Sequence, residues 1–590
     1  MKTRIPSPIK KLVQDKQDEK LKKQQNNHDQ SGLPSQDQNQ IQEQEQDQDS
    51  AQNQEPSQPK NKSEGKAKEK FKIKKQTQYQ NQSSLTQKNI DISSDLTENI
   101  DYIKKTVGNS TDIVIREFQA GQNGEIKIAI IFTDGLTNSA ELQDFVLNTL
   151  MFEIRNAELD SMVFDRSNLF NLVKTQSLPV AGISDIYDFQ KLFFHLLSGD
   201  SILFIDGYSQ AISISLRHWA DRGVQEPSSQ TVVRGPKDGF TETLRKNTAL
   251  IRRRIKDPNL WIETQQIGTK TQTDVAIMYL KGVANDKTVA EVQSRLNRIS
   301  IDAILESGYI EELIQDKTYT PFPTVYNTER PDAVAAAILE GRIAILVDGT
   351  PFVLVVPALF VHFLQASEDY YQRADIATLI RLLRYISFFL ALLTPSLFIA
   401  VTTFHQEMLP TQLLISLASQ REGVPFPALV EALMMELTFE VLREAGVRLP
   451  RAVGSSISIV GALVIGQAAV EAGIISASMV IIVSLTAISS FVSPNFNMSI
   501  SVRILRFLFM LLAASFGLVG IILGLIVMVL HLNSLRSFGV PYLAPFAPFI
   551  LKDQKDSIIR MPHWSLFSRP RLISQKDIKR EDTPSPKPSN

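Results

Sequence analysis

The sequence predicts a soluble α/β region of two α/β subdomains followed by an all-α membrane domain. Three observations support this fold class. Residues 1–93 are strongly polar, residues 94–372 alternate strand-like and helix-like apolar patterns, and residues 373–533 are dominated by long apolar stretches. A helix that crosses a bilayer needs roughly 20 predominantly apolar residues, and only the third region supplies such segments. We therefore expect a domain of about four transmembrane helices, with one re-entrant or interfacial helix in addition.

The composition excludes several kinds of site. The chain of 590 residues has a formal net charge of −1 and contains no cysteine. A charge near zero gives no reason to expect nucleic acid as a partner. Without cysteine there can be no disulfide, zinc–thiolate site, iron–sulfur cluster or cysteine nucleophile. The GxxxxGK(S/T), HExxH and GxSxG motifs are also missing from the sequence. We therefore expect no cofactor, no metal ion and no enzymatic activity.

Residues 1–93 predict a disordered tail. Gln, Lys, Asp, Glu, Asn and Ser dominate this stretch. Such a composition cannot bury enough apolar area to offset the entropy lost on ordering. A basic arm at Lys66–Lys75 that contacts anionic lipid is the alternative interpretation, although the acidic residues upstream of it favour a solvated linker.

The first α/β subdomain is expected over residues 94–223. Strand-like runs at Ile113–Ile115 and Ile126–Phe132 are followed by a helical spacing of apolar residues across 140–157. Two further strand-like runs flank the Asp-Gly dipeptide at Asp206. Because glycine tolerates the positive φ of a tight turn, this dipeptide predicts a β-hairpin.

The second α/β subdomain is expected over residues 224–372. It contains a strand at Asp274–Tyr279, helical patterns at Thr288–Leu296 and 301–314, and a second Asp-Gly dipeptide at Asp348. An aspartate at such a place can act as an acid, a base or a metal ligand, but β-turn aspartates are far more common. We therefore interpret both aspartates as turn residues.

Three consecutive arginines, Arg252–Arg254, end one predicted helix. Successive helical residues point about 100° apart, so these side chains cannot form one flat basic patch. A solvated or salt-bridged helix end is one interpretation. An interface with an acidic neighbouring subunit or with lipid headgroups is the other.

Four apolar segments within residues 373–533 are candidate membrane spans: Leu382–Val401, Ala452–Val470, Ile474–Phe491 and Phe507–Leu530. Pro395 lies inside the first span, and in lipid the carbonyl group that a proline frees must find a partner in protein or water. Gly520 and Gly524 in the last span form a GxxxG pattern, which can let another helix approach closely.

The basic residues predict that both ends of the membrane domain face the cytoplasm. Arginines precede the first span and a basic tail at 534–590 follows the last, so an even number of crossings is expected. Against the same rule, four arginines would then lie on the outer side: Arg448, Arg451, Arg503 and Arg506. A fifth crossing between Phe426 and Gly446 would bring these arginines inside but would place the tail outside.

The segment Phe426–Gly446 carries a narrow charged stripe. In a helix, Glu436, Glu440, Arg443 and Glu444 fall within a sector roughly 100° wide, while most other residues are apolar. A re-entrant or interfacial helix that faces a vestibule is one interpretation, because charges at membrane depth tend to mark ion or substrate paths. Salt bridges between residues three and four apart on a surface helix are the other.

Seven stretches of the chain are long and distinctive: Arg234–Glu242 (RGPKDGFTE), Asn247–Ile255 (NTALIRRRI), Glu329–Asp332 (ERPD), Leu339–Pro351 (LEGRIAILVDGTP), Thr403–Thr411 (TFHQEMLPT), Glu436–Pro450 (ELTFEVLREAGVRLP) and Ile459–Val470 (IVGALVIGQAAV). They resemble the A subunit of the GerA family of spore germinant receptors. The resemblance extends from about Asp95 to Phe549 and leaves the polar N-terminal residues outside it.

This resemblance implies a multi-pass subunit of the spore inner membrane in an endospore-forming bacterium, in contact with membrane lipid. It implies two partners, a transporter-like B subunit that binds the nutrient and a lipoprotein C subunit. It also implies that A subunits form a homo-oligomer, proposed to be a pentameric ring, whose membrane helices make a nutrient-gated channel for monovalent cations. Ion release through this channel would trigger spore germination.

Within that framework the serine-rich third span offers a candidate pore face. Ser476, Val480, Ser484 and Ala487 share one side of a helix at i, i+4, i+8 and i+11. Hydroxyls on this side would replace part of an ion's water, Val480 would form an apolar gate, and Glu471 just before the helix would attract cations. The alternative is that the serines bond to their own backbone carbonyls and the span only packs in a bundle.

A secondary transporter, or a scaffold that supports the nutrient-binding subunit without forming the pore, is the alternative function. Transporters often contain internal repeats around a midplane site. The predicted spans show no second half that resembles the first. The channel subunit is therefore the favoured interpretation, and an enzyme ranks behind both.

Overall fold

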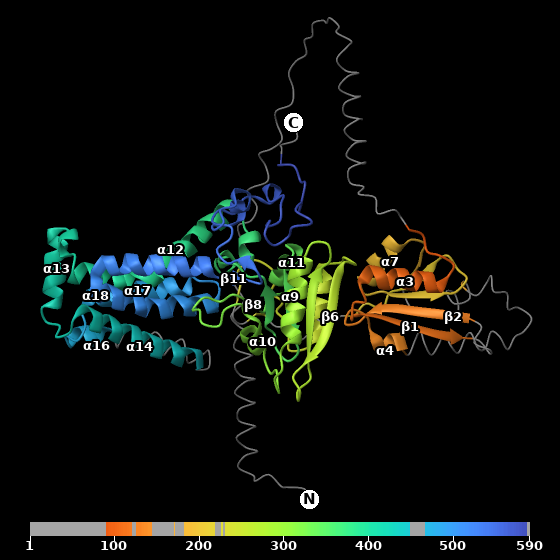
Figure 1. Ribbon diagram of the computed structural model, residues 1–590, viewed down its shortest axis with the longest axis horizontal. Coiled ribbons are helices and arrows are strands. Elements are labelled where there is room, and N and C mark those ends of the chain that lie inside the picture. The colour runs from red at the N-terminus through yellow and green to blue at the C-terminus, as the bar shows by residue number, and fades with distance from the viewer. Residues whose placement is uncertain are drawn as a thin grey trace, which may run out of the picture. The chain divides into compact units, whose positions relative to one another are not determined.

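Two antiparallel five-stranded sheets form the α/β region of the protein (Figure 1). The structure is a computed structural model and describes residues 90–120, 126–143, 170, 182–218, 226–227, 230–448 and 466–586. The predicted tail up to residue 89 lies outside the described residues, as does most of the predicted helix 140–157 and of the predicted span Ala452–Val470.

The two sheets share one topology. The first, in the order β1-β2-β4-β5-β3, consists of β1 (Ile113–Ala120), β2 (Ile126–Thr133), β3 (Ile183–Ile186), β4 (Ser201–Ile205) and β5 (Ala211–Ile214). The second, in the order β6-β7-β9-β10-β8, consists of β6 (Leu260–Ile267), β7 (Thr273–Leu280), β8 (Tyr326–Thr328), β9 (Ile343–Val347) and β10 (Val353–Val356). Counted along the chain, both orders read first, second, fourth, fifth, third. The α/β region is therefore a structural duplication.

The two Asp-Gly dipeptides occupy equivalent hairpin turns and make the same contact in each copy. Asp206 follows β4, and its carboxylate accepts a hydrogen bond from the backbone N–H of Leu96, the first residue of α3 (Leu96–Val107). Asp348 follows β9 and accepts in the same way from Leu244, the first residue of α8 (Leu244–Arg254). A helix N-terminus leaves backbone N–H groups without intrahelical partners. Each aspartate therefore joins a hairpin to a helix.

Helices cover both faces of the second sheet. α8 and α11 (Pro331–Leu339) share one core with Leu346, while α9 (Asp286–Asn297) and α10 (Ser307–Ile314) share another with Ile345. Ile345 and Leu346 are neighbours in β9, and successive strand residues point to opposite faces. Burial on both faces explains why every residue of β9 is apolar. Over the first sheet, α3 and α7 (Phe189–Leu196) pack together (Figure 1).

A buried arginine joins the two copies. Arg252 of α8 donates to both carboxylate oxygens of Asp112, at 2.8 and 3.0 Å, and to the hydroxyl of Ser110 at 3.1 Å. The side chains of Arg252 and Asp112 are each 1% exposed. Arg254 pairs instead with Asp238. The arginine run is therefore a salt-bridged helix end, and one of its members is buried against the first copy within the same chain.

The helical region follows the second sheet and contains α12 (Ala374–Thr403), α13 (Thr411–Arg421), α14 (Ala428–Arg448), α16 (Gly466–Glu471), α17 (Ala477–Phe491) and α18 (Phe496–Ser534). An α/β region followed by a helical region is the predicted order. Among the helices that the structure describes, α12 and α18 are long and apolar enough to cross a membrane. The short elements are α4 (Ser139–Glu141), η3 (Phe360–Leu364), η4 (Ser367–Tyr370), η5 (Gln406–Met408), β11 (Arg536–Ser537), β12 (Val540–Pro541), η7 (Leu551–Asp556) and η8 (His563–Ser565).

α18 is a hairpin of two antiparallel helices. A straight helix of its 39 residues would be about 58 Å long, nearly twice the ~30 Å of a bilayer's hydrocarbon. Gly517 breaks it, with φ 59° and ψ −138°. A Cβ at Gly520 would lie 2.2 Å from the carbonyl oxygen of Leu512, so the two halves touch backbone to backbone. The prediction of one span at Phe507–Leu530 is corrected accordingly, because the chain reverses inside it.

Both ends of this hairpin contact one loop that precedes β8. Ser501, near the start of α18, donates to the backbone oxygen of Pro321. His531, near the end of α18, shares a hydrogen bond of 2.8 Å with the hydroxyl of Thr320. The start and the end of α18 therefore lie at the same end of the helix bundle.

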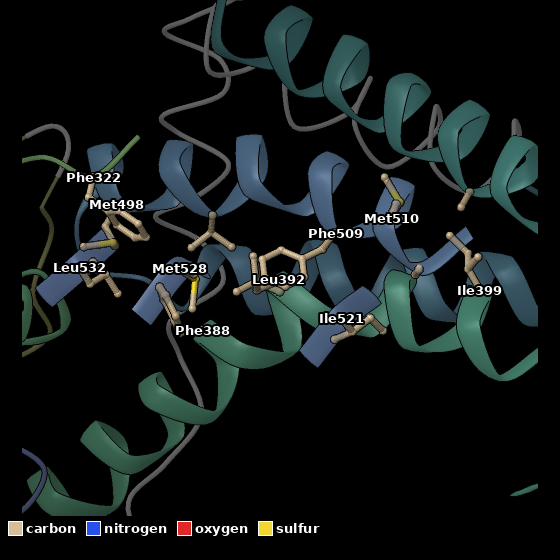
Figure 2. Packing of buried hydrophobic residues seen from close by; sticks show 14 of the residues in the cluster. Phe322, Phe388, Leu392, Ile399, Met498, Phe509, Met510, Ile521, Met528 and Leu532 are labelled. Atoms are coloured by element: carbon tan, nitrogen blue, oxygen red, sulfur yellow. The ribbon is translucent and has the colours of Figure 1, made fainter. Parts of the chain in front are cut away.

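Residues from the two ends of α18 also meet in the buried core of the bundle, as expected if the chain reverses at Gly517. Phe322, Met498 and Leu532 gather at one end of this core in Figure 2. At the opposite end Gly517 lies against His405, directly after α12, where a Cβ on the glycine would meet the imidazole ring at 2.7 Å. The bundle is thus closed at one end by the turn of the hairpin and held at the other by the α/β region.

Replacing Arg252 with Met should destabilise the α/β region, because the buried carboxylate of Asp112 would lose its partner. Breaking a buried ion pair from one side costs about 3–5 kcal/mol. Urea unfolding followed by hydrogen exchange in β1 and β6 measures this loss. Arg298→Met, at an exposed arginine, is the matched control and should leave unfolding unchanged. The double variant Arg252→Met, Asp112→Leu should recover most of the loss, and equal losses in the single and double variants would contradict the assigned pair.

Candidate functional site

Two ion pairs, one buried and one half-buried, join α14 to the first half of α18. Arg506 donates from Nη1 to Oε2 of Glu436 at 2.5 Å, and neither side chain is more than 1% exposed. Arg503 donates in the same way to Glu440 at 2.6 Å. Residues three or four apart lie on one side of a helix, so each helix presents its two charged residues together. Because the pairing order is reversed along the chain, α14 and this half of α18 run antiparallel.

Arg506 also completes the hydrogen bonding of α12. Its Nε donates to the backbone oxygen of Ala391 at 2.8 Å. Proline has no N–H, so Pro395 cannot donate to the carbonyl group four residues before it, and that carbonyl belongs to Ala391. An unpaired carbonyl in the hydrocarbon region is strongly unfavourable. Arg506 therefore supplies the partner that the sequence requires for the carbonyl freed by Pro395, and it connects α12, α14 and α18.

A further buried carboxylate, Glu431, joins α13, α14 and α17. Its Oε1 accepts a hydrogen bond from Nε of Arg421 at 3.3 Å. Its Oε2 accepts from the hydroxyl and from the backbone N–H of Ser476, at 2.8 and 3.1 Å. Ser476 in turn caps α17 by accepting from the N–H of Met479 at 3.4 Å. The sequence leaves Glu431 outside the charged stripe, because it falls on another side of the helix. Its partners lie on two other helices and could not be read from this segment alone.

The predicted charged stripe divides into two parts. Its first two members, on the side toward α18, make the ion pairs described above. Arg443 lies 5.8 Å from the centre of the Phe491 ring. Glu444 is exposed and pairs with Arg448, four residues later in the same helix, at 2.6 Å. A salt bridge within one surface helix therefore accounts for Glu444, whereas pairing between helices accounts for Glu436 and Glu440.

Several polar atoms of this cluster keep unused hydrogen-bonding capacity. They are Oε1 of Glu436, Oε1 of Glu440, Nη1 of Arg443, Nε of Arg503 and Nη2 of Arg506, all buried and without a hydrogen-bond partner among the described residues. Buried polar atoms are nearly always satisfied by protein or water. The cluster can therefore bind water or a small ion. In the described part of the chain, no three histidine, aspartate or glutamate side chains gather as ligands for a metal ion.

The candidate pore residues are distributed between the core of the bundle and its surface. Ser476 precedes α17 and is buried, and Ala487 is buried as well. Val480 is half-buried, whereas Ser484 is exposed. Glu471 ends α16 and is exposed. Within a single chain these side chains do not line one surface, so a common pore face for them stays a prediction about an assembly.

Hydroxyl groups on the packed side of α17 bond within their own helix. Thr486 and Ser490 donate to the carbonyl oxygens of Ile482 and Ala487, each at 2.7 Å. Such bonds satisfy a hydroxyl without a partner helix. They agree with the alternative interpretation of this span, in which hydroxyls bond to backbone carbonyls of their own helix and the span packs in a bundle. The exposed side of α17, which carries Ser484, is the side available to another chain or to lipid.

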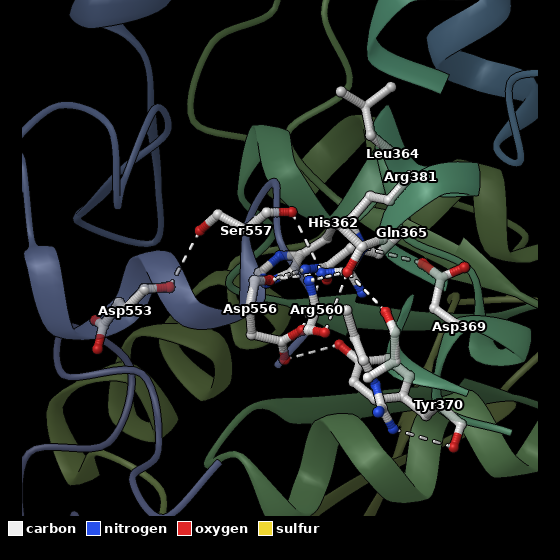
Figure 3. A network of polar contacts seen from close by, with 12 residues as sticks. His362, Leu364, Gln365, Asp369, Tyr370, Arg381, Asp553, Asp556, Ser557 and Arg560 are labelled. Atoms are coloured by element: carbon white, nitrogen blue, oxygen red, sulfur yellow. Dashed lines mark hydrogen bonds and ion pairs between the residues drawn. The ribbon is translucent and has the colours of Figure 1, made fainter. Parts of the chain in front are cut away.

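Two arginines tie the first turns of α12 to the segments around it. Arg381 bonds the carboxylates of Asp369 and Asp556, at 3.1 and 2.9 Å (Figure 3). Arg384 bonds the same Asp369 carboxylate at 2.8 Å. The hydroxyl of Tyr370 donates to the same Asp556 carboxylate at 2.9 Å. The sequence suggested that these arginines set the membrane orientation by their charge. The structure instead buries them in a network with two carboxylates.

Burial governs protonation in this network. It raises the pKa of Asp556, while attraction to Arg381 opposes the rise. The pKa of Tyr370 lies well above its usual range because the ring is buried and the Asp556 carboxylate is close. Tyr370 therefore remains a hydrogen-bond donor at neutral pH and keeps η4, just before α12, attached to the C-terminal segment.

Comparison with known proteins identifies relatives over most of the chain. The family model described as Bacillus/Clostridium GerA spore germination protein matches residues 101–572. Over 492 residues the chain is 51% identical to spore germination protein KA of Bacillus subtilis (strain 168), covering 83% of this chain and 89% of that protein. It is 46% identical over 495 residues to the uncharacterized membrane protein YfkQ of the same strain, covering 83% and 94%. It is 40% identical over 490 residues to spore germination protein GerLA of Bacillus cereus, covering 83% and 98%.

A solved structure is also similar. It is the crystal structure of the N-terminal domain of the A subunit of the Bacillus megaterium spore germinant receptor GerK3, with 43% sequence identity and a TM-score of 0.37, and the match covers 46% of this chain and 99% of that one. The family match spans both sheets and the helical region, and it confirms the resemblance and the expectation that the chain is not an enzyme. The chain belongs to the GerA family of spore germination proteins.

Proposed function

We propose that this chain is the A subunit of a nutrient germinant receptor in the spore inner membrane, and that copies of it form a nutrient-gated channel for monovalent cations. The ring is taken to be pentameric. The observation that carries the proposal is the cluster of buried and half-buried charged side chains between α14 and α18, in a chain of a spore germination family. Ionisable residues inside a membrane bundle are energetically costly and tend to mark ion or substrate paths. Ion release through the proposed channel would trigger germination.

The names of the relatives support the partners in this proposal. Several relatives are spore germination proteins, and the solved N-terminal domain is that of an A subunit of a germinant receptor. The chain would work with a transporter-like B subunit, which binds the nutrient, and with a lipoprotein C subunit. Nutrient binding by the B subunit would then change the packing of the A-subunit helices, and the A subunits would conduct.

An even number of crossings fits this proposal, with the α/β region and the C-terminal segment both in the cytoplasm. The sequence predicts four spans, the reversal at Gly517 adds a fifth crossing, and α14 adds a sixth. A crossing by α14 alone would place the C-terminal segment outside the cell. The hairpin returns it to the inside, in keeping with its basic composition.

The exposed side of α17 would face the axis of the ring. Ser484 lies on this side, Val480 borders it, and Glu471 precedes it as an exposed carboxylate. In this arrangement Glu471 attracts cations at the mouth, Val480 narrows the path and Ser484 replaces part of the ion's water. Ser476 has a different role, because its hydroxyl is bonded to Glu431.

Substitutions on α17 test the channel directly. Ser484→Ala and Val480→Ala should change the potassium conductance of the full chain in planar bilayers, because they alter the narrow part of the path, and should leave the size of the assembly unchanged. Leu485→Ala is the matched control, since this exposed residue points about 100° away from Ser484. Equal conductance in all three variants would contradict the pore face. A wild-type chain that assembles but carries no current would favour the transporter or scaffold alternative.

Replacing Arg506 with Met should destabilise the bundle by about 3–5 kcal/mol, because it leaves the Glu436 carboxylate buried without a partner. Pro395→Ala should relieve part of this loss, since alanine provides an N–H that can donate to Ala391. The two changes should therefore be non-additive by about 1 kcal/mol. Unfolding of the four proteins of the cycle in detergent measures this coupling.

Arg448→Met serves as the control for that cycle, because this arginine is exposed and, among the residues that the structure describes, forms its ion pair with Glu444 of its own helix. It should leave the stability of the bundle within about 0.5 kcal/mol of the wild type. Strictly additive effects of Arg506→Met and Pro395→Ala would show that the Ala391 carbonyl does not depend on Arg506.

A further inference from the structure

The segment that follows the helix bundle exposes an unusual amount of apolar surface. We call residues 549–567 the C-terminal shelf. Phe549, Leu551, Ile559, Trp564 and Phe567 of the shelf are between 42% and 74% exposed. Single exposed apolar side chains are ordinary on a protein surface, whereas apolar patches mark surfaces that bind a partner or a membrane. Five such side chains in one short segment therefore indicate a candidate binding surface.

The acidic residues of the shelf point toward the protein, whereas Lys552 points away from it. Asp553 accepts a hydrogen bond from the backbone N–H of Arg571 at 3.0 Å, and Asp556 pairs with Arg381 at 2.9 Å. Lys552, in contrast, is exposed. The outward surface of the shelf therefore combines apolar side chains with the positive charge of Lys552. This composition complements a layer of anionic lipid headgroups.

The shelf lies at the depth of such a layer. The hydroxyl of Thr378 in α12 donates to the backbone oxygen of Arg560 and accepts from its N–H, both at 3.2 Å. Thr378 precedes the predicted start of the first span, Leu382, by one helical turn, or about 6 Å. The headgroup region on each side of a bilayer is about 5–7 Å thick. These contacts therefore hold the shelf beside the headgroups.

The apolar surface of the shelf continues that of α12. Leu379, Leu382 and Leu383, in the first turns of α12, are all exposed. The ring of Phe546, just before the shelf, lies 6.4 Å from the ring of Tyr385. Exposed apolar side chains on a membrane helix face lipid, and this ring contact brings the start of the shelf beside that side of α12.

We propose that the C-terminal shelf is a membrane-surface anchor that inserts its apolar side chains among the lipid headgroups of the leaflet from which α12 enters. Trp564 fits this occupant, because tryptophan is enriched at the headgroup level. Lysine beside apolar side chains is also typical of segments that lie in the interface. The anchor is independent of the channel and rests only on the crossing of the membrane by α12. Through Asp556 and Arg381 it connects the bilayer surface to that helix.

Single cysteines test the anchor, because the chain contains no cysteine of its own. Leu551→Cys and Ile559→Cys carry a bimane label on the shelf, and Leu305→Cys carries it at a matched leucine, 64% exposed, before α10. Each full-length chain is reconstituted into vesicles of phosphatidylglycerol and phosphatidylethanolamine, with lipid brominated near the headgroup end of an acyl chain in both leaflets. Bromine should quench both shelf labels and not the label at position 305. Aqueous iodide should quench the label at position 305 more than either shelf label.

Three results would overturn the anchor. Shelf labels that iodide quenches as readily as the label at position 305 would lie in water. Shelf labels protected from both quenchers would be covered by another protein or by a second copy of the chain. Equal bromine quenching at all three positions would show no preference for the shelf. Labels at two shelf positions guard against a local distortion at one of them. Because neither quenching measurement depends on ion conduction, a failure of the anchor can be distinguished from a failure of the channel.

Discussion

One buried arginine satisfies two polar groups inside the bundle, and the packing of three helices depends on it. Arg506 binds the Glu436 carboxylate and the carbonyl group that Pro395 frees on α12. Each of these acceptors alone would be costly in an apolar environment. A guanidinium group carries five N–H donors in a fixed plane and can serve both at once. The proline in α12 is therefore compatible with a membrane helix because of a residue on α18.

The same logic holds at both ends of the bundle, where carboxylates bind groups from different helices. Glu431 meets Arg421 and Ser476 at the end that contains the start of α17, and Arg381 meets Asp369 and Asp556 at the end that contains the start of α12. These contacts leave α14 and α12 little freedom to slide unless a buried pair is exchanged. A ligand changes such an equilibrium only by binding the two arrangements with different affinity. Gating would therefore require an alternative set of partners for the glutamates of α14.

Patterns of neighbouring residues in the sequence predicted much of the fold. The remaining features depend on contacts between residues that are distant in sequence. The Asp-Gly dipeptides predicted both hairpins because turn chemistry depends on adjacent residues. They did not reveal that Asp206 and Asp348 bond the first residues of α3 and α8, which are distant in sequence. The reversal at Gly517 gave no signal, because the residues on both sides are equally apolar. The charged stripe was visible on α14, but its partners depend on how that helix packs.

The pairs on α18 also change how the charge rule applies to this chain. Arg503 and Arg506 conflicted with the predicted orientation when each was counted as a free positive charge. Each is paired with a glutamate of α14 inside the bundle, so the two pairs together carry no net charge and give no preference for either side of the membrane. The exposed basic residues of the C-terminal segment, such as Lys552 and Arg571, carry that preference instead. Orientation is therefore better judged from basic side chains that form no ion pair with a carboxylate. In this chain such side chains lie at the end of the bundle that meets the α/β region, which is the end proposed to face the cytoplasm.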